Sequence, residues 1–427
     1  IALAFAATSF CQQQSWWRGD PYSVQHLQVL FGTLALWCAA WSLGRRLTRR
    51  RWPDVVGLMR CNDLAVDDLV LGGTVVGMFV MCLVASATGS AVELGITASV
   101  GSMAAPLWTN VFALGSWIAL MFLAVAAIGS LIERFSLPAF SAPFLIASIG
   151  AMLIGGHAYD TVAVASALRW SCALLGVVLT LAVCMSSQIK TALQRLTWLE
   201  WGELPRKLDE LTRSWTLSLS AIPILGLTTA SLIQAAAGNA PQGPTENSFF
   251  SEMGSELSYG VPLALLVAVL ITHAVREKQT ILMLAGSGVF QYLVNLAYFL
   301  PILKDPSARF DWPVAIGCLQ WNSLGLALFA IGWLGVRRWV DVRHHANSQQ
   351  AFDRCLVVQV IAALAMASAT ASLATAFVVS TPDDLTRCTE LGNWLSYLIC
   401  LLGFGAAAWL VRTRLEQFGI SLFLGFL

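Results

Sequence analysis

Long apolar runs without charged residues recur along this chain and restrict the folds open to it. A helix needs about 20 predominantly apolar residues to cross the hydrocarbon core of a membrane, and eleven stretches of the sequence reach that length. We therefore predict an all-α, polytopic transmembrane helical bundle. The expected spans are 24–44, 68–90, 107–130, 137–156, 161–185, 214–237, 258–275, 279–303, 312–335, 354–380 and 391–411.

The charge content agrees with lipid as the main solvent of the chain. Only 11% of the residues are charged, whereas soluble globular domains carry about 25%. The formal net charge of +1 provides no overall basic field. We expect the lipid bilayer as a partner, with other membrane subunits as further candidates, and we expect no nucleic acid.

The basic residues predict how the chain is oriented in the membrane. Lys and Arg concentrate in cytoplasmic loops of membrane proteins. When residues 45–67 are placed in the cytoplasm, strict alternation of the expected spans places 20 of the 25 basic residues on that side. The cytoplasmic loops are then 45–67, 186–213, 274–280 and 336–353. We expect a multi-pass protein of a bacterial inner membrane.

Both ends of the sequence carry short apolar runs, residues 1–10 and 419–427. Each run is shorter than a full span and is typical of a membrane helix cut partway through. We expect the chain to be a piece of a longer protein, with a partial span at each end.

Three stretches of the sequence resemble one another and indicate an internal repeat. Each carries, near the start of an expected span, a leucine followed by a long polar residue: Leu27-Gln28, Leu168-Arg169 and Leu319-Gln320. Later motifs recur in the same order between the first and third copies, where Leu114-Gly115-Ser116-Trp117 matches Leu391-Gly392-Asn393-Trp394. The middle copy is the weakest of the three.

These matches predict tandem units of four helices. An even number of spans makes successive units parallel in the membrane rather than inverted. The expected organisation is the end of a preceding membrane helix with an external loop at 1–19, a first repeat at 20–160, a second at 161–310 and an incomplete third at 311–427.

Polar residues within the expected spans are the candidates for function, because ionisable groups in a membrane are costly. Arg169 lies one or two turns inside its span, and Asp160 is close enough in sequence to pair with it. Arg169 predicts a contact with an anion or substrate, and the competing interpretation is a side chain that snorkels to the interface. Gln28 and Gln320 occupy its position in the other two copies, which favours an interhelical hydrogen bond there.

Four further residues are polar candidates inside the spans. His273, near the cytoplasmic end of its span, is either a proton relay or an interfacial histidine. Gln291, Asn295 and Asn322 lie in consecutive spans and either line a polar path or join helices by hydrogen bonds. We favour the interfacial histidine and the helix-joining role.

An external aspartate precedes the first helix of each unit, at Asp20, Asp160 and Asp311. These carboxylates suit an enzyme acting on lipid-linked substrates, but capping of helix N-termini is the simpler role. No cysteine or histidine pair has the spacing of a zinc or haem ligand set, so we expect no metal or other cofactor.

Three functions follow from the sequence, in this order of preference. A transporter or channel-like module fits the many spans, the parallel repeats and the short loops. A structural or assembly subunit of a membrane complex fits the repeats and the absence of a catalytic motif. A membrane-embedded enzyme is third, and no substrate is identified for any of them.

Overall fold

The described residues of the computed structural model are helical almost throughout. They comprise 24–51, 64–88, 114–133, 138–157, 161–185, 213–236, 254–277, 279–304 and 312–343, with isolated positions near residue 10 and at 188. No β-strand occurs within these ranges. The all-helical class predicted from the apolar runs is confirmed for this part of the chain.

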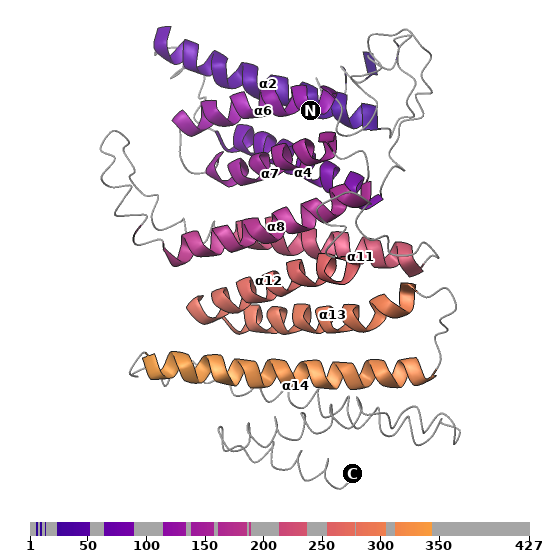
Figure 1. Ribbon diagram of the computed structural model, residues 1–427. Coiled ribbons are helices and arrows are strands. Elements are labelled where there is room, and N and C mark those ends of the chain that lie inside the picture. The colour runs from indigo at the N-terminus through magenta and orange to yellow at the C-terminus, as the bar shows by residue number, and fades with distance from the viewer. Residues whose placement is uncertain are drawn as a thin grey trace. The chain divides into compact units, whose positions relative to one another are not determined.

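The helices follow the order of the expected spans (Figure 1). The first five are α2 (Val24–Arg51), α4 (Leu64–Thr88), α6 (Leu114–Glu133), α7 (Pro138–His157) and α8 (Thr161–Cys184). A short π-helix, η2 (Leu217–Ala221), leads into α11 (Ile222–Ala236). The last three are α12 (Gly254–Glu277), α13 (Thr280–Lys304) and α14 (Trp312–Arg343). The expected spans at 354–380 and 391–411 lie outside the described residues.

Five of the described helical segments are long and apolar enough to cross a membrane. They are Leu27–Gly44, Ala165–Cys184, Arg213–Ile233, Glu256–Glu277 and Ile281–Leu303. Shorter apolar segments occur at Leu69–Val84, Leu114–Gly129 and Ser141–Leu153. Several long apolar helices in one chain are what a multi-pass integral membrane protein requires.

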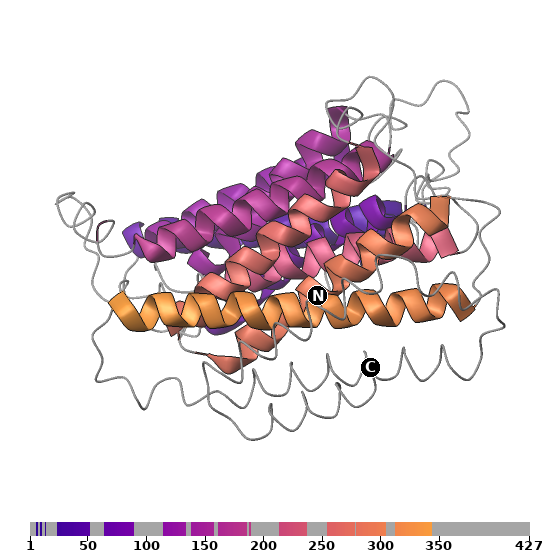
Figure 2. The same cartoon turned by 60° about the horizontal axis from the view of Figure 1, so that its bottom comes forward.

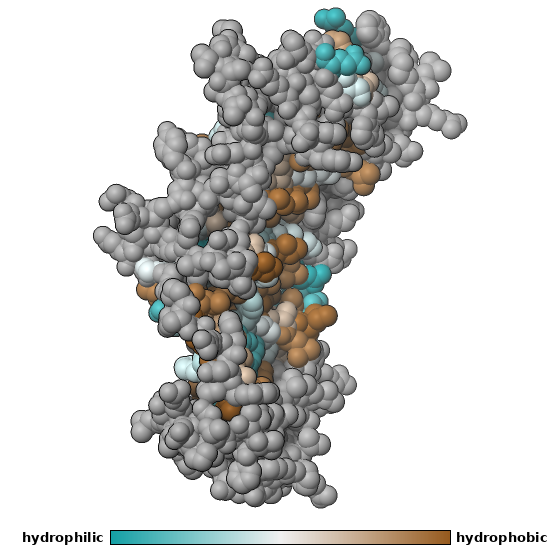
Figure 3. Space-filling view, turned by 90° about the vertical axis from the view of Figure 1, so that its right-hand side faces the viewer, coloured by the Kyte–Doolittle hydropathy of each residue, from teal (hydrophilic) through white to brown (hydrophobic). Residues whose placement is uncertain are grey.

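Large apolar side chains also lie on the outer surfaces of the helices. Leu69, Ile146 and Ile281 are 73%, 66% and 71% exposed. Hydrophobic residues, in brown, form patches on the described surface that faces the viewer in Figure 3. In water such surface would cost free energy in proportion to its area, whereas lipid tails solvate it, so the outer surface supports the same conclusion as the span lengths.

The chain divides into two compact units. The first comprises residues 1–233 and 242–258, and the second comprises residues 234–241 and 259–427. The first turn of α12 therefore belongs to the first unit, and the rest of that helix belongs to the second.

In the first unit, α2 packs along α6 and α4 packs along α7 (Figure 1). Their shared core includes Met78, Leu123 and Met152, all fully buried. The rings of Phe79 and Phe144 meet edge to face with centroids 5.7 Å apart, one of the arrangements that aromatic pairs prefer.

In the second unit, α13 packs on α14, which is a single helix of 32 residues (Figures 1 and 2). Phe290 of α13 contacts Phe329 of α14 with ring centroids 5.8 Å apart. Gly286 brings α13 close to α12, because a Cβ there would lie 3.6 Å from Cβ of Leu270. Close approach at small residues is the usual way in which helices associate in membranes.

The expected span at 214–237 differs from a regular α-helix in its first half. The backbone N–H of Ile222 donates to the carbonyl of Leu217, five residues earlier. Pro223 follows immediately, and proline both lacks an N–H donor and crowds the carbonyl four residues before it. The helix widens at this point to relieve the crowding by Pro223, which accounts for the π-helical turn.

Candidate functional site

The buried Arg169 of α8 is the charged candidate that the structure places most deeply. It lies within the candidate membrane span Ala165–Cys184 and is 1% exposed. Its Nη2 lies 3.2 Å from Oγ of Ser166, three residues earlier on the same helix, and 3.2 Å from Oγ of Ser258 on α12. Both serines are buried. The guanidinium is thus held between a hydroxyl group of α8 and one from the first turn of α12, both within the first unit.

Two interpretations of Arg169 were drawn from the sequence, an anion or substrate contact and a side chain that snorkels to the interface, and both stay predictions. A snorkelling arginine extends its charged end to the interface and stays accessible there. The guanidinium of Arg169 instead lies among packed side chains. A charge taken out of water in this way is costly unless hydrogen bonds compensate it. An arginine at this position therefore needs the hydrogen-bonding groups packed around it. Asp160, the expected partner, lies outside the described residues.

Gln28 occupies the corresponding place at the start of the predicted first repeat. Its side chain is 1% exposed, and its Nε2 donates to Oγ of Ser116 on α6 at 3.0 Å. The third residue of the set, Gln320 on α14, is also buried, at 5% exposed. All three positions that the predicted repeat aligns therefore hold a polar side chain within the packed helices.

The three side-chain amides that the sequence singled out, those of Gln291, Asn295 and Asn322, come together between α13 and α14. Nδ2 of Asn322 donates to Oδ1 of Asn295 at 2.6 Å, and Nδ2 of Asn295 donates to Oδ1 of Asn322 at 3.1 Å. Nε2 of Gln291 also donates to Oδ1 of Asn322. Cys318 completes this carboxamide cluster, with its Sγ 3.6 Å from Oδ1 of Asn295.

His273 lies near the end of α12 and is 3% exposed. Its Nδ1 lies 3.3 Å from Oε1 of Glu277, one turn later on the same helix. The expectation of an interfacial histidine did not include this carboxylate partner. The spacing of four residues places the two groups on one face of the helix, so the pairing was available from the sequence.

The external aspartates Asp20, Asp160 and Asp311 all lie outside the described residues, and their expected roles stay predictions.

Sequence reasoning missed the serines that bridge to Gln28 and Arg169. Ser116 and Ser258 are each followed by an aromatic residue, Trp117 and Tyr259. The predicted third copy has a polar residue and an aromatic at the matching place in the sequence, Asn393-Trp394. A search for a small polar residue followed by an aromatic would have found the middle member of this set.

The chain matches no protein-family model, no curated protein and no solved structure.

Proposed function

We propose that this chain is a membrane transport module that moves a small anionic solute and contacts it through Arg169. The observation that carries the proposal is the burial of this guanidinium within a candidate membrane span. Ionisable residues inside membrane helices are rare and usually belong to solute paths, ion paths or proton relays.

The chemistry of the site suits an anion. The guanidinium offers up to five N–H donors in a fixed plane that matches carboxylate and phosphate oxygens. Ser166 and Ser258 place hydroxyl groups beside it, and a hydroxyl can also donate to an anion. The surrounding helices exclude water, which strengthens any charge-assisted hydrogen bond formed there.

We further propose that the architecture is the tandem array of parallel four-helix units predicted from the sequence, with eleven full spans. Two buried bridges support it. Gln28 and Ser116 join α2 to α6, while Arg169 and Ser258 join α8 to α12. Arg169 follows Gln28 by 141 residues, and Ser258 follows Ser116 by 142 residues. Each bridge therefore joins the first and third helices of a proposed unit. The residues at the two ends of the bridge recur at nearly the same interval in the sequence.

In this arrangement the arginine-rich loops lie in the cytoplasm of a bacterial cell. The second repeat alone replaces the neutral amide of the bridge with a charge. A bridge that holds helices together in one repeat would thereby have become a solute contact in the next.

The test is efflux from proteoliposomes that contain the purified chain. The vesicles are loaded in separate experiments with chloride, phosphate, sulfate, acetate, sodium or glycerol. We expect at least one anion to leave faster than from protein-free vesicles, while sodium and glycerol do not. The proposal fails if no anion leaves faster, or if all solutes leak equally.

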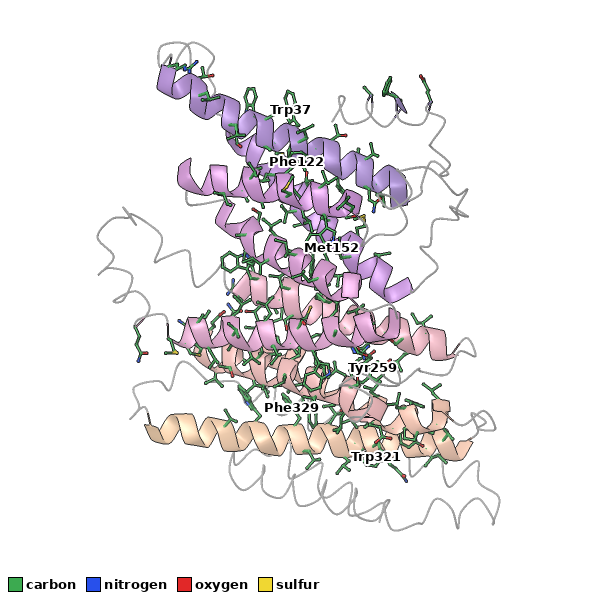
Figure 4. The ribbon with its side chains drawn as sticks, turned by 45° about the horizontal axis from the view of Figure 1, so that its top comes forward. Trp37, Phe122, Met152, Tyr259, Trp321 and Phe329 are labelled. Carbon is green, nitrogen blue, oxygen red and sulfur yellow. The ribbon has the colours of Figure 1, made fainter. Side chains whose placement is uncertain are left out.

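The second candidate is an assembly subunit of a membrane complex. The observation that favours it is the stacked pair Trp37 and Trp41 on the outer side of α2 (Figure 4 labels Trp37), which are 49% and 38% exposed with ring centroids 6.1 Å apart. Tryptophan is enriched where proteins associate. Crosslinking in native membranes separates the candidates, since a transport module without partners yields no heteromeric product through α2.

A further inference from the structure

The carboxamide cluster lies near the middle of two uncharged helical stretches. Residues 280–303 of α13 and 312–336 of α14 contain no Asp, Glu, Lys or Arg. Gln291 and Asn295 are one turn apart in α13, and Asn322 faces them from α14. A polar group at this depth cannot rely on lipid for a hydrogen bond, so the partners of each atom decide what the cluster does.

Most hydrogen-bonding atoms of the cluster are satisfied within it. Asn295 and Asn322 exchange hydrogen bonds in both directions. Asn322 also donates to the backbone carbonyl of Cys318 at 2.7 Å, and its Oδ1 accepts from Gln291. These contacts leave one acceptor to account for.

That acceptor is Oε1 of Gln291. Within the part of the chain that the structure describes, this oxygen is buried and accepts no hydrogen bond. A buried acceptor without a donor costs about 1–3 kcal/mol, and such atoms in native proteins call for an explanation. Gly325 of α14 lies directly against this oxygen, because a Cβ there would be only 2.9 Å from it.

We propose that the carboxamide cluster is a mid-membrane binding site for a small uncharged solute that carries N–H or O–H donors. The solute donates to Oε1 of Gln291. The uncharged surroundings provide no counter-charge for an ion. This site is independent of Arg169 and does not depend on the anion-transport proposal.

Cys318 provides a built-in reporter of access to the cluster. Its Sγ lies 3.6 Å from Oδ1 of Asn295 and 3.4 Å from Nδ2 of Asn322. Thiols react with methanethiosulfonates as thiolates, so fast modification needs water and reagent at the sulfur. Cys82 and Cys172, 0% and 4% exposed, are internal controls in the same chain, and the exposed Cys184 is a positive control.

The experiment treats the full chain in proteoliposomes with a small methanethiosulfonate and follows each cysteine by peptide mass spectrometry. We expect Cys318 to react at least about tenfold faster than Cys82 and Cys172, because its surroundings admit water. We also expect acetamide, a small neutral N–H donor, to slow Cys318 without slowing Cys184. If Cys318 reacts as slowly as the buried cysteines, the cluster is a dry clamp between helices and the proposal is overturned.

A substitution separates a binding site from a merely wet gap. Gln291→Met removes the open acceptor and keeps a side chain of similar length. We expect Cys318 to remain reactive in this variant and acetamide protection to disappear. Protection that persists, or acetamide that never protects the unchanged protein, contradicts the assignment of Oε1 as the binding atom. The measurement on the unchanged protein decides the question even if the variant fails to fold.

Discussion

Gly77 of α4 lies against the ring of Phe31 of α2, so replacing it with alanine tests how closely these helices approach. A Cβ at Gly77 would lie 2.7 Å from Cε1 and 2.9 Å from Cζ of Phe31, well inside the contact distance of two carbon atoms. Gly73, one turn earlier in α4, has nothing within 4 Å of the same position. The two glycines therefore form a matched pair within one helix.

The two substitutions share one energetic term and differ in another. Alanine in place of glycine within a helix is worth up to about 1 kcal/mol, and both variants gain it. Overpacking costs about 1–3 kcal/mol, and only Gly77→Ala incurs it. We therefore expect Gly77→Ala to have a free energy of unfolding lower than that of Gly73→Ala by about 1–3 kcal/mol.

The assay is reversible denaturation of the purified chain in mild detergent, followed by circular dichroism. A second substitution, Phe31→Leu, removes the ring atoms that the new methyl group would meet. It should cost less in the Gly77→Ala background than in the unchanged protein, because it relieves the overpacking there. Equal stability of Gly77→Ala and Gly73→Ala, or no rescue by Phe31→Leu, would refute the close packing of α2 on α4.

Two further outcomes test the packing and the bridge of the first unit. A double-mutant cycle of Gln28→Leu and Ser116→Ala should give a coupling free energy of about 0.6–1.7 kcal/mol, the range measured for hydrogen bonds between membrane helices, and a coupling of zero would remove the bridge. Leu123→Ala should lower the free energy of unfolding by about 2–5 kcal/mol, because Leu123 is fully buried. Met121→Ala on the outer face of α6, where Met121 is 57% exposed, should cost much less, and similar losses for both would mean that α6 is oriented differently.

The sequence predicted where helices lie better than where they end. Hydropathy placed a span at 24–44, whereas α2 continues to Arg51. The apolar run marks only the part of a helix that lipid would surround, and arginine is itself a good helix former. α14 likewise continues past the expected end at residue 335 to Arg343.

The sequence predicted the main residues of the polar sites but not all of the partners that they contact. Gln28 and Arg169 were visible because the predicted repeat aligned them. Their serine partners were missed, since serine is common in membrane helices and only the aromatic residue after each one sets it apart. Asn295 and Asn322 are 27 residues apart, and only the way α13 packs on α14 brings their amides together. The repeat itself stays a prediction.

Arg169→Gln tests the central claim most directly, because it replaces the charged bridge with the amide found at Gln28 and Gln320. Two quantities are measured on one preparation: the free energy of unfolding in detergent and the rate of anion efflux from proteoliposomes. We predict a change in stability of less than about 1 kcal/mol, the usual size of such a hydrogen bond. Efflux should fall by about tenfold or more, because a hydrogen bond to a charged group is worth about 1.5–3 kcal/mol. Unchanged efflux, or a loss of stability that accounts for the loss of efflux, would contradict a role for Arg169 in contacting the solute.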